Sequence, residues 1–384
     1  MVDKRLEFGL LGPLEMSIDG DLVSLGTPKQ RAVLAMLVIN RNRPVGVDAL
    51  ITALWEDWPP AGARASIHSY VSNLRKLLGG AGVDPRAVLA AAPPGYRLSI
   101  PDNTCDLGRF IAEKTAGVHA AAAGRFEEAS RHLSAALREW RGPVLDDLRD
   151  FQFVDAFATA LVEDKILAHT AKAEAEIACG RAAAVITELE TLTVEHPYRE
   201  PLWAQLITAY YLTDRQSDAL GAYRRVKTTL AEDLGIDPGP TLRALNDRIL
   251  RQEPLDAKMN AQSTAVGTIT VLDQRTMVSG QQAVAFLHDV ASGHDYPLRT
   301  AATRIGRLSD NDIVLESANV SRHHAVIIDT GTNFIINDLR SSNGVHVQHQ
   351  RIRAAATLND GDQVRICDHE FTFQITARPE RGPR

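Results

Sequence analysis

Short runs of β-branched and aromatic residues, separated by polar turns, occupy the C-terminal part of this chain. They include Ala325–Ile328, Asn333–Ile336 and Phe371–Ile375, and apolar and polar residues alternate strictly in the last of these. Glycine, asparagine and aspartate lie between the runs, as they do at turns between strands. A series of short strands with polar turns is typical of a β-sandwich, so this region is expected to be all-β rather than helical.

Three loops between these runs carry side chains that are suited to binding phosphate. They contain Gly306-Arg307, Ser321-Arg322-His323-His324 and Ser341-Ser342-Asn343-Gly344. An arginine presents a planar fork of donors that fits a phosphate dianion, and a serine adds a short hydroxyl donor. An asparagine amide can hold a peptide backbone through its paired donor and acceptor. Because binding residues usually lie on loops of a rigid scaffold, the set predicts a phosphate-binding site.

The segment 268–377 resembles the forkhead-associated (FHA) domain, a β-sandwich that binds phosphothreonine peptides. The resemblance implies that Arg307 and Ser321 hold the phosphate and that Asn343 holds the peptide backbone. Ser342, where the family often has threonine, would assist. The alternative for each of these residues is an ordinary surface side chain without a ligand.

The same resemblance assigns further residues of the loops. Gly306, His324 and Gly344 match positions that shape the loops, and Arg322 and Arg340 are candidates for contacts with the peptide. The family often has glycine where this chain has Arg340, which leaves open the preference for residues beyond the phosphothreonine. His323 and His324 have no partner at zinc-ligand spacing, so a structural role is favoured over zinc binding for these histidines.

Composition and charge exclude several functional classes. The chain has 384 residues, enough for two or three domains, and a formal net charge of −6, which argues against general coating of nucleic acid but permits a local basic patch. Its cysteines, Cys105, Cys179 and Cys367, are far apart and predict neither a disulfide framework nor a metal site. The apolar runs are shorter than a membrane span. We expect a cytoplasmic protein without a membrane segment, metal or cofactor.

The first hundred residues combine strand-like runs with helices. The runs Leu6–Leu11 and Leu14–Ile18 come first. A helix is expected to follow, with Thr27 as its N-cap, Pro28 at its first position and Gln30 completing a capping box. A second, shorter helix is predicted over 48–55, and a hairpin over 88–100.

A third helix, predicted over 64–78, has one apolar face and one polar face. No acidic residue occurs between Gly62 and Val83 or between Leu22 and Val47. The alternatives for the polar face are a DNA-binding surface and an ordinary solvated surface. The candidate DNA contacts are Lys29, Arg31, Arg64, His68, Ser69, Ser72, Asn73, Arg75, Lys76 and Arg97.

The order of strands, three helices and a hairpin resembles the winged helix-turn-helix at the front of Streptomyces antibiotic regulatory proteins. Matching stretches are Thr27–Arg31, Val47–Trp55, Ser72–Leu77 and Gly95–Leu98. The resemblance implies that the third helix enters the major groove and that the hairpin contacts the adjacent minor groove. Two groups of candidates would then differ in role. Those that would reach base edges or nearby phosphates are His68, Ser72, Asn73 and Arg75, and those that would neutralise phosphates are Lys29, Arg31, Lys76 and Arg97.

Residues 105–252 are predicted to be helical and to contain a repeat. Gly124-Arg125, Gly180-Arg181 and Asp214-Arg215 each stand at a predicted turn, and the last two lie 34 positions apart, the length of a tetratricopeptide repeat. The region resembles the bacterial transcriptional activation domain of the same regulator family. Such stacked helix pairs usually bind proteins, which implies contact with RNA polymerase or a second copy of the chain.

The predicted organisation is therefore multidomain. It consists of a winged helix over 1–104, a helical tetratricopeptide-like domain over 105–252, a linker over 253–267, an all-β FHA sandwich over 268–377 and a tail over 378–384. In this order the parts resemble mycobacterial EmbR-type regulators. That resemblance implies an activator that binds promoter DNA, has candidate targets among cell-wall arabinan synthesis genes, and is docked through phosphothreonine by a phosphorylated Ser/Thr protein kinase.

Two other functional classes are alternatives to this interpretation. The first is a phosphopeptide-binding adaptor, or kinase substrate, whose winged helix contacts only proteins. The second is an enzyme, but the sequence contains no Walker A phosphate loop, nucleophile elbow or kinase catalytic set. We therefore expect a protein without catalytic activity.

Overall fold

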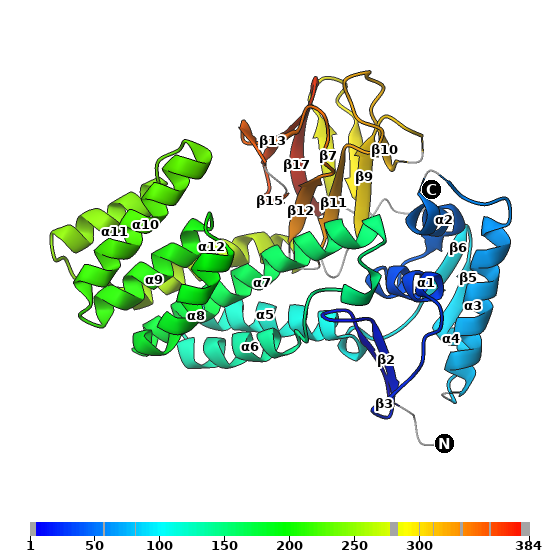
Figure 1. Cartoon of the computed structure of the whole chain (residues 1–384), viewed down its shortest axis with the longest axis horizontal. Coiled ribbons are helices and arrows are strands. Elements are labelled where there is room, and N and C mark those ends of the chain that lie inside the picture. The colour runs from blue at the N-terminus through cyan, green and yellow to red at the C-terminus, as the bar shows by residue number, and fades with distance from the viewer. Residues whose placement is uncertain are drawn as a thin grey trace. The chain divides into compact units, whose positions relative to one another are not determined.

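The computed structural model of the chain is drawn in Figure 1. The chain divides into two compact units. The described residues are 5–56, 58–80, 82–276, 283–298, 300–309, 311–330, 333–352 and 355–377. Unit 1 contains those up to residue 111, those of 138–164 and those from 271 onward, whereas unit 2 contains 112–137 and 165–270.

The N-terminal part of unit 1 is a winged helix-turn-helix, as predicted. Its strands β1 (Leu6–Gly9), β2 (Glu15–Ile18) and β3 (Asp21–Leu22) form one antiparallel sheet, and β4 (Val45–Gly46), β5 (Leu89–Ala92) and β6 (Gly95–Leu98) form a second. Its helices are α1 (Pro28–Ile39), α2 (Val47–Trp55), α3 (Ala63–Gly80) and the short α4 (Pro85–Val88). The hairpin of β5 and β6 is the wing.

The start of α1 confirms one prediction and corrects another. Thr27 caps the helix, accepting a hydrogen bond from the backbone N–H of Gln30, and Pro28 is the first helical residue. The prediction of a capping box is wrong, because the Gln30 side chain is buried and does not reach back to Thr27. Its amide donates to the carbonyl oxygen of Leu25 and accepts from Asn73 on α3. Gln30 therefore joins α1 to α3 instead of closing the cap.

A buried carboxylate, that of Asp106, fixes the chain where the winged helix ends. Asp106 begins α5 (Asp106–Ala122), and its oxygens accept the backbone N–H groups of Leu10 and Leu11 at 2.8–2.9 Å. The guanidinium of Arg141 lies 3.3 Å from the same carboxylate and 2.6 Å from Glu15. These bonds hold the start of α5 and residues 138–164 in unit 1, so the predicted boundary at 104/105 does not coincide with the division between the units.

The remaining helices continue the expected helical region. They are α6 (Phe126–Arg138), α7 (Gln152–Ala178), α8 (Ala182–Glu195), α9 (Glu200–Leu212), α10 (Gln216–Leu234), α11 (Pro240–Leu250) and α12 (Ala257–Thr276), with short 3₁₀ turns η1 (Asp102–Thr104) and η2 (Asp146–Leu148). In unit 2, α9 packs between α8 and α10.

The repeated dipeptides of the helical region lie at turns of one kind. Gly124, Gly180 and Asp214 each follow a helix with a left-handed backbone, at φ values of 73°, 81° and 60°. The N–H group of the arginine that follows each of them bonds to the carbonyl oxygen five residues earlier, at 2.8–2.9 Å. This bond closes a helix in a Schellman motif, which requires a residue that tolerates positive φ. Glycine and aspartate meet that requirement, which explains the sequence repeat physically.

The predicted linker is helical in the structure. Residues 253–256 precede α12, and Ala261 and Ala265 of this helix are buried. Within unit 2, Ala265 packs against small residues of α5, α6 and α7, among them Ala121, Ala129 and Ala175. Ala261 packs against Phe126 and Ala178. The prediction of a linker over 253–267 rested on weak apolar periodicity. Alanines pack closely without producing a strong periodic signal, so the helix was missed.

The C-terminal part of unit 1 is a sandwich of two sheets, as predicted. The strands are β7 (Ala283–Asp289), β8 (Asp295–Leu298), β9 (Ala302–Gly306), β10 (Ile313–Val314), β11 (Ala325–Asp329), β12 (Phe334–Asp338), β13 (Val345–Val347), β14 (Gln350–Arg351), β15 (Ala355–Leu358), β16 (Gln363–Ile366) and β17 (His369–Ala377). One sheet has the order β14-β13-β16-β17-β7-β8, and the other has β10-β9-β11-β12-β15.

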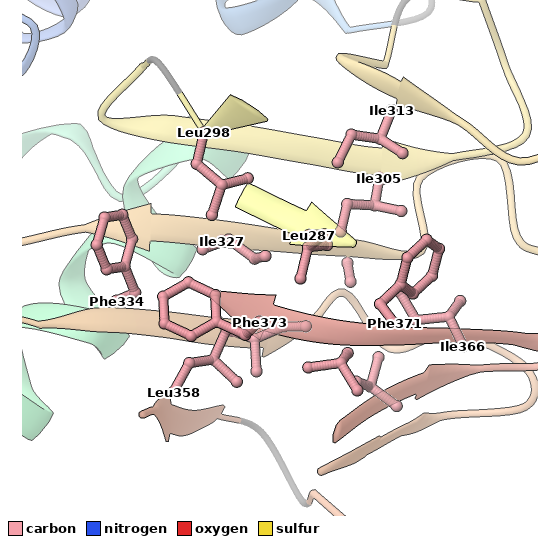
Figure 2. Packing of buried hydrophobic residues seen from close by; sticks show 14 of the residues in the cluster. Leu287, Leu298, Ile305, Ile313, Ile327, Phe334, Leu358, Ile366, Phe371 and Phe373 are labelled. Atoms are coloured by element: carbon pink, nitrogen blue, oxygen red, sulfur yellow. The ribbon is translucent and has the colours of Figure 1, made fainter. Parts of the chain in front are cut away.

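Aromatic residues of β17 anchor the core between these sheets (Figure 2). Phe371 and Phe373 are completely buried, and the Phe373 ring lies 5.3 Å from the ring of Phe334 on the opposite sheet. Thr372 and Gln374, which alternate with them, are only partly buried. The strict alternation in the sequence thus corresponds to an inner and an outer face.

Two strands of the second sheet are buried on both faces. On β11, Ile327 points into the sandwich core, whereas the outward residues Val326 and Ile328 are 4% and 2% exposed. The outward Ile335 of β12 is fully buried. Within unit 1, Val326 and Ile328 line a cavity of about 280 Å³ together with side chains of α1, α2 and α7. The sandwich therefore packs on the winged helix and the start of α7 through an apolar sheet face.

We expect Phe373→Ala to destabilise the sandwich by about 3–5 kcal/mol, because it removes a fully buried ring from the core. Glu370→Ala, at an exposed position of the same strand, should change stability by no more than about 0.5 kcal/mol. Chemical denaturation followed by circular dichroism measures both. Equal losses for the two variants would contradict this account of the core.

Candidate phosphopeptide site and nucleic-acid interface

Three loops of the sandwich are joined by hydrogen bonds at one place. The backbone N–H of Arg307 donates to the carbonyl oxygen of Ser321 at 3.1 Å. The backbone N–H of Ser342 donates to the Ser321 hydroxyl at 3.2 Å, and the Asn343 amide donates to the carbonyl oxygen of Asn319 at 2.8 Å. The structure thus brings together the residues that the sequence predicts to bind a phosphopeptide.

Their side chains retain hydrogen-bonding capacity for a ligand. The side chain of Arg307 is exposed and forms no hydrogen bond or ion pair with any residue that the structure describes. The Ser321 oxygen accepts a bond from Ser342, so its own proton is available to a phosphate oxygen. Asn343 uses one amide hydrogen and keeps the second hydrogen and its carbonyl oxygen.

Glycines are required at two of the loop positions for different reasons. A Cβ atom on Gly306 would lie 2.2 Å from the carbonyl oxygen of Arg322, so any side chain would separate the first two loops. Gly344 has a φ of 75°, and its Cβ would lie 2.3 Å from the Arg351 guanidinium. Both glycines therefore shape the loops, as the family resemblance implied.

His324 is fully buried beneath the loops and bonds to two of them. Its Nδ1 accepts the backbone N–H of Ser321 at 3.1 Å, so Nε2 carries the proton and donates to the carbonyl oxygen of Gly344 at 3.2 Å. Burial lowers the pKa of His324 below its ordinary value of 6.5. A neutral His324 is thus the form that holds Ser321 in place.

Arg340 has an unusual backbone conformation. Its φ is 56°, a left-handed value that glycine adopts without strain. This explains physically why the family often has glycine there. The exposed Arg340 side chain has no hydrogen-bond or ion-pair partner within the described ranges, and it adds positive charge to the third loop. Arg322 is also exposed.

Three polar residues to which no role could be assigned from the sequence support the site. The buried Asn311 donates from its amide to the carbonyl oxygens of Leu308 and Arg322. Asn319 supplies the acceptor for Asn343, and the Ser341 hydroxyl accepts the N–H of Gly344. Asparagine and serine are frequent in all turns, so nothing in their spacing distinguished these residues.

The polar face of α3 is exposed, as the predicted interface requires. Ile67, Val71, Leu74 and Leu78 form its buried face. Exposed candidates on the helix are Arg64, His68, Ser69, Ser72, Asn73 and Lys76, and Arg97 is exposed on the wing. Arg75 on α3, and Lys29 and Arg31 on α1, are partly buried.

Two candidates on α3 also hold the wing. The Arg75 Nε donates to the carbonyl oxygen of Leu89 at 3.0 Å, and its guanidinium lies 5.6 Å from the ring of Tyr96. The Tyr96 hydroxyl lies 2.5 Å from Nδ1 of His68. Tyr96 was not among the predicted residues, although it positions two of them. Arg75 and His68 therefore have structural contacts in addition to any contact with DNA.

The other candidates differ in how far they are occupied by contacts within the protein. Arg64 pairs with Asp48 at 2.5 Å and Arg31 with Asp147 at 3.5 Å. Asn73 donates to Gln30, Ser69 donates to the carbonyl oxygen of Ala65, and Lys29 lies 4.6 Å from the ring of Trp55. Among the residues that the structure covers, Ser72, Lys76 and Arg97 have no side-chain partner. These three are the most accessible candidates.

The described residues contain no cluster of three or more histidine, cysteine, aspartate or glutamate side chains that could hold a metal ion. None of the helices in the described part of the chain has the length and apolar character needed to cross a membrane.

Comparisons with known proteins agree with the fold. Three family models match successive segments: transcriptional regulatory protein, C terminal, over 21–98; bacterial transcriptional activator domain over 105–250; and FHA domain over 303–367. The chain is 86% identical to the transcriptional regulatory protein EmbR of Mycobacterium tuberculosis over 381 residues, covering 99% of this chain and 98% of that protein.

Two further comparisons extend this result. The transcriptional regulatory protein MoaR1 of Mycobacterium tuberculosis is 56% identical over 252 residues, which cover 65% of this chain and 81% of MoaR1. The solved structure of Mycobacterium tuberculosis EmbR in complex with a low-affinity phosphopeptide has 86% identity and a TM-score of 0.97. The match covers 98% of this chain and 100% of the EmbR chain in that structure.

We expect the sandwich to lose stability as the pH falls below about 6.5, because His324 is protonated more readily in the unfolded chain than in the folded protein. The stability contributed by neutral His324 is fully present above about pH 6.5 and is lost as the pH falls through the lowered pKa of the folded protein. His324→Asn should show a shallower loss. Unfolding free energies measured between about pH 7.5 and about pH 5 test this, and parallel curves for the two proteins would contradict it.

Proposed function

This chain belongs to the EmbR family of transcriptional regulatory proteins, and we propose that it binds promoter DNA in response to a phosphothreonine signal. The DNA is bound by α3 and the wing, and the signal is received by the FHA domain. A phosphorylated Ser/Thr protein kinase is the partner that presents the phosphothreonine. One observation carries the proposal: hydrogen bonds between three loops bring Arg307, Ser321 and Asn343 together at one place.

The phosphate is bound by charge-assisted hydrogen bonds. The Arg307 fork pairs with two phosphate oxygens, and the Ser321 hydroxyl donates to an oxygen of the same group. Asn343 contacts the peptide backbone through the amide hydrogen and carbonyl oxygen that it retains. Ser342, whose backbone is fixed to Ser321, supports this contact, and Arg322 and Arg340 add positive charge beside the peptide.

The DNA-binding surface follows from the exposed side of α3. A helix with an acid-free polar face fits the major groove, and an adjacent wing reaches the minor groove. Lys76 and Arg97, which have no partner in the described structure, are assigned to phosphates. Ser72 and Asn73 are assigned to base edges, since short polar side chains near the middle of a recognition helix read hydrogen-bond patterns.

Direct contact between the FHA sandwich and the winged helix supports a short route between input and output. Within unit 1, the side-chain oxygen of Asn40 at the end of α1 accepts the backbone N–H of Ala301 at 3.3 Å. Arg43 lies 3.7 Å from Asp329 at the end of β11. A docked kinase is thereby held near the DNA-binding domain, at a high effective concentration for phosphorylating this protein. The added phosphate charge changes how the domain binds DNA.

Other aspects of the proposal concern location and further partners. RNA polymerase and a second copy of this chain are the partners proposed for unit 2, because stacked helix pairs offer extended protein-binding surfaces. Cell-wall arabinan synthesis genes are the first promoters to test, since the family resemblance implies them. A cytoplasmic location follows from promoter binding.

Removing the phosphate clamp should abolish phosphopeptide binding. Arg307→Ala is expected to weaken binding of a phosphothreonine peptide library by about tenfold or more, because a charge-assisted bidentate pair is lost. Arg340→Gly keeps the left-handed backbone and removes only the side chain, so it should alter selectivity for neighbouring residues more than overall affinity. Fluorescence anisotropy with phosphorylated and unphosphorylated libraries measures both. Unchanged affinity of the Arg307 variant would exclude the proposed clamp.

Selection of duplex DNA from a random pool tests the output. The full-length protein should enrich a motif, and Lys76→Ala with Arg97→Ala should lower the slope of log affinity against log salt by about two, one for each phosphate contact. Arg243→Ala with Lys258→Ala, at exposed positions of unit 2, removes equal charge and should leave the slope unchanged. Absence of an enriched motif would favour an adaptor whose winged helix contacts only proteins.

A further inference from the structure

Residues of α8, α9 and α10 in unit 2 line a wide groove, and α9, which packs between the other two helices, forms its floor. The groove has a volume of about 820 Å³. Val194 at the end of α8 is 79% exposed at one edge. On the other side Ser217, Gly221, Arg224 and Thr228 follow one another at helical spacing along α10.

The charge of the groove is positive. Arg224 and Arg225 are exposed, and neither has an ion pair or hydrogen bond to a side chain in the described residues. A third arginine, Arg215, pairs with Asp218 at 2.7 Å. Asp218 is the acidic residue among those that line the groove. Its charge is compensated by this ion pair with Arg215. The groove therefore offers two uncompensated guanidinium groups to a ligand.

The floor of the groove is rigid. The Trp203 indole N–H donates to the carbonyl oxygen of Pro197 at 2.8 Å, and the Arg225 guanidinium lies 5.6 Å from the indole ring. The Tyr210 hydroxyl donates to Glu190. Both rings are at most 5% exposed, so they are part of the helical core. Their fixed positions hold Arg225 over the floor of the groove.

Neither the backbone conformation nor the packing within the described structure requires a glycine at position 221. It sits inside α10, where glycine costs about 0.5–1 kcal/mol relative to alanine. Its φ is not positive, and a Cβ atom would approach nothing closer than the Arg224 guanidinium at 3.9 Å. Packing would thus permit a side chain here. A missing side chain on the wall of a groove is useful when another backbone must come close.

We propose that this groove binds an extended acidic segment of a partner protein. Arg224 and Arg225 pair with carboxylates of the segment, and its backbone passes over Gly221. The hydroxyl groups of Ser217 and Thr228 are available to the peptide groups of the segment. The site is separate from the phosphothreonine site and from the DNA-binding helix, so the inference rests on neither.

A peptide fits these observations better than a nucleic acid does. Proteins that bind single strands stack bases on exposed aromatic rings, whereas Trp203 and Tyr210 are buried beneath the groove. Duplex DNA requires a broader basic surface for its regularly spaced phosphates. The groove offers instead two arginines, small polar side chains and an accessible stretch of helix, which suit a narrow chain with a few carboxylates.

The test uses the full chain and two fluorescent peptides. One alternates Glu with Ser, and the other has Gln in place of every Glu. The Glu peptide should bind, and Arg224→Gln with Arg225→Gln should weaken binding by about tenfold or more, because two charge-assisted pairs are lost. Lys227→Gln with Arg243→Gln removes the same charge at exposed positions outside the groove and should have little effect.

A second variant separates loss of the site from loss of the fold. Gly221→Leu fills the groove without changing charge, and it should keep or raise thermal stability because leucine favours helix over glycine. The same variant should no longer bind the Glu peptide, but it should retain phosphopeptide binding at the FHA domain. The proposal is overturned if the Glu and Gln peptides bind equally, if the arginine variant binds like the control, or if a single-stranded oligonucleotide, not the peptide, depends on Arg224 and Arg225.

Discussion

A buried carboxylate at the start of α5 is the constraint on which the arrangement of unit 1 depends. Asp106 is 2% exposed, and an unpaired charge there would be strongly destabilising. Two backbone N–H groups just after β1, those of Leu10 and Leu11, and the guanidinium of Arg141 compensate it. The same four-part contact thereby joins the end of β1, the start of α5 and residues 138–164. Segments far apart in sequence become one scaffold, and the winged helix takes its position from that scaffold.

Local sequence signals predicted much of this fold, and long-range contacts decided the rest. Thr27 and Pro28 mark the start of α1 because capping depends on neighbouring residues alone. The alternation around Phe373 likewise follows from strand geometry. Gln30 has the spacing of a capping box, yet a side chain of α3, distant in sequence, recruits it elsewhere. Residues 257–267 lack apolar periodicity, and their helix is stabilised by alanine contacts that only the folded unit supplies.

The candidate phosphopeptide site shows the same division. Side chains suited to binding phosphate are distinctive in sequence, so Arg307, Ser321 and Asn343 could be proposed from their chemistry alone. Residues that hold the loops together, such as Asn311, resemble ordinary turn residues and could not. On the winged helix the polar residues on one face of α3 are indistinguishable from one another in the sequence. The structure divides that face into side chains such as Arg75, which also bind the wing, and side chains such as Lys76, which face solvent alone.

The double-sided burial of β11 and β12 has a consequence for how such regulators are assembled. An isolated sandwich needs one apolar face per sheet, but Val326, Ile328 and Ile335 give this one a second. Cut free at its boundaries, the sandwich would present that second face to water and tend to associate through it. Recombination that moved it to another chain would succeed only where the new host supplied a matching apolar surface.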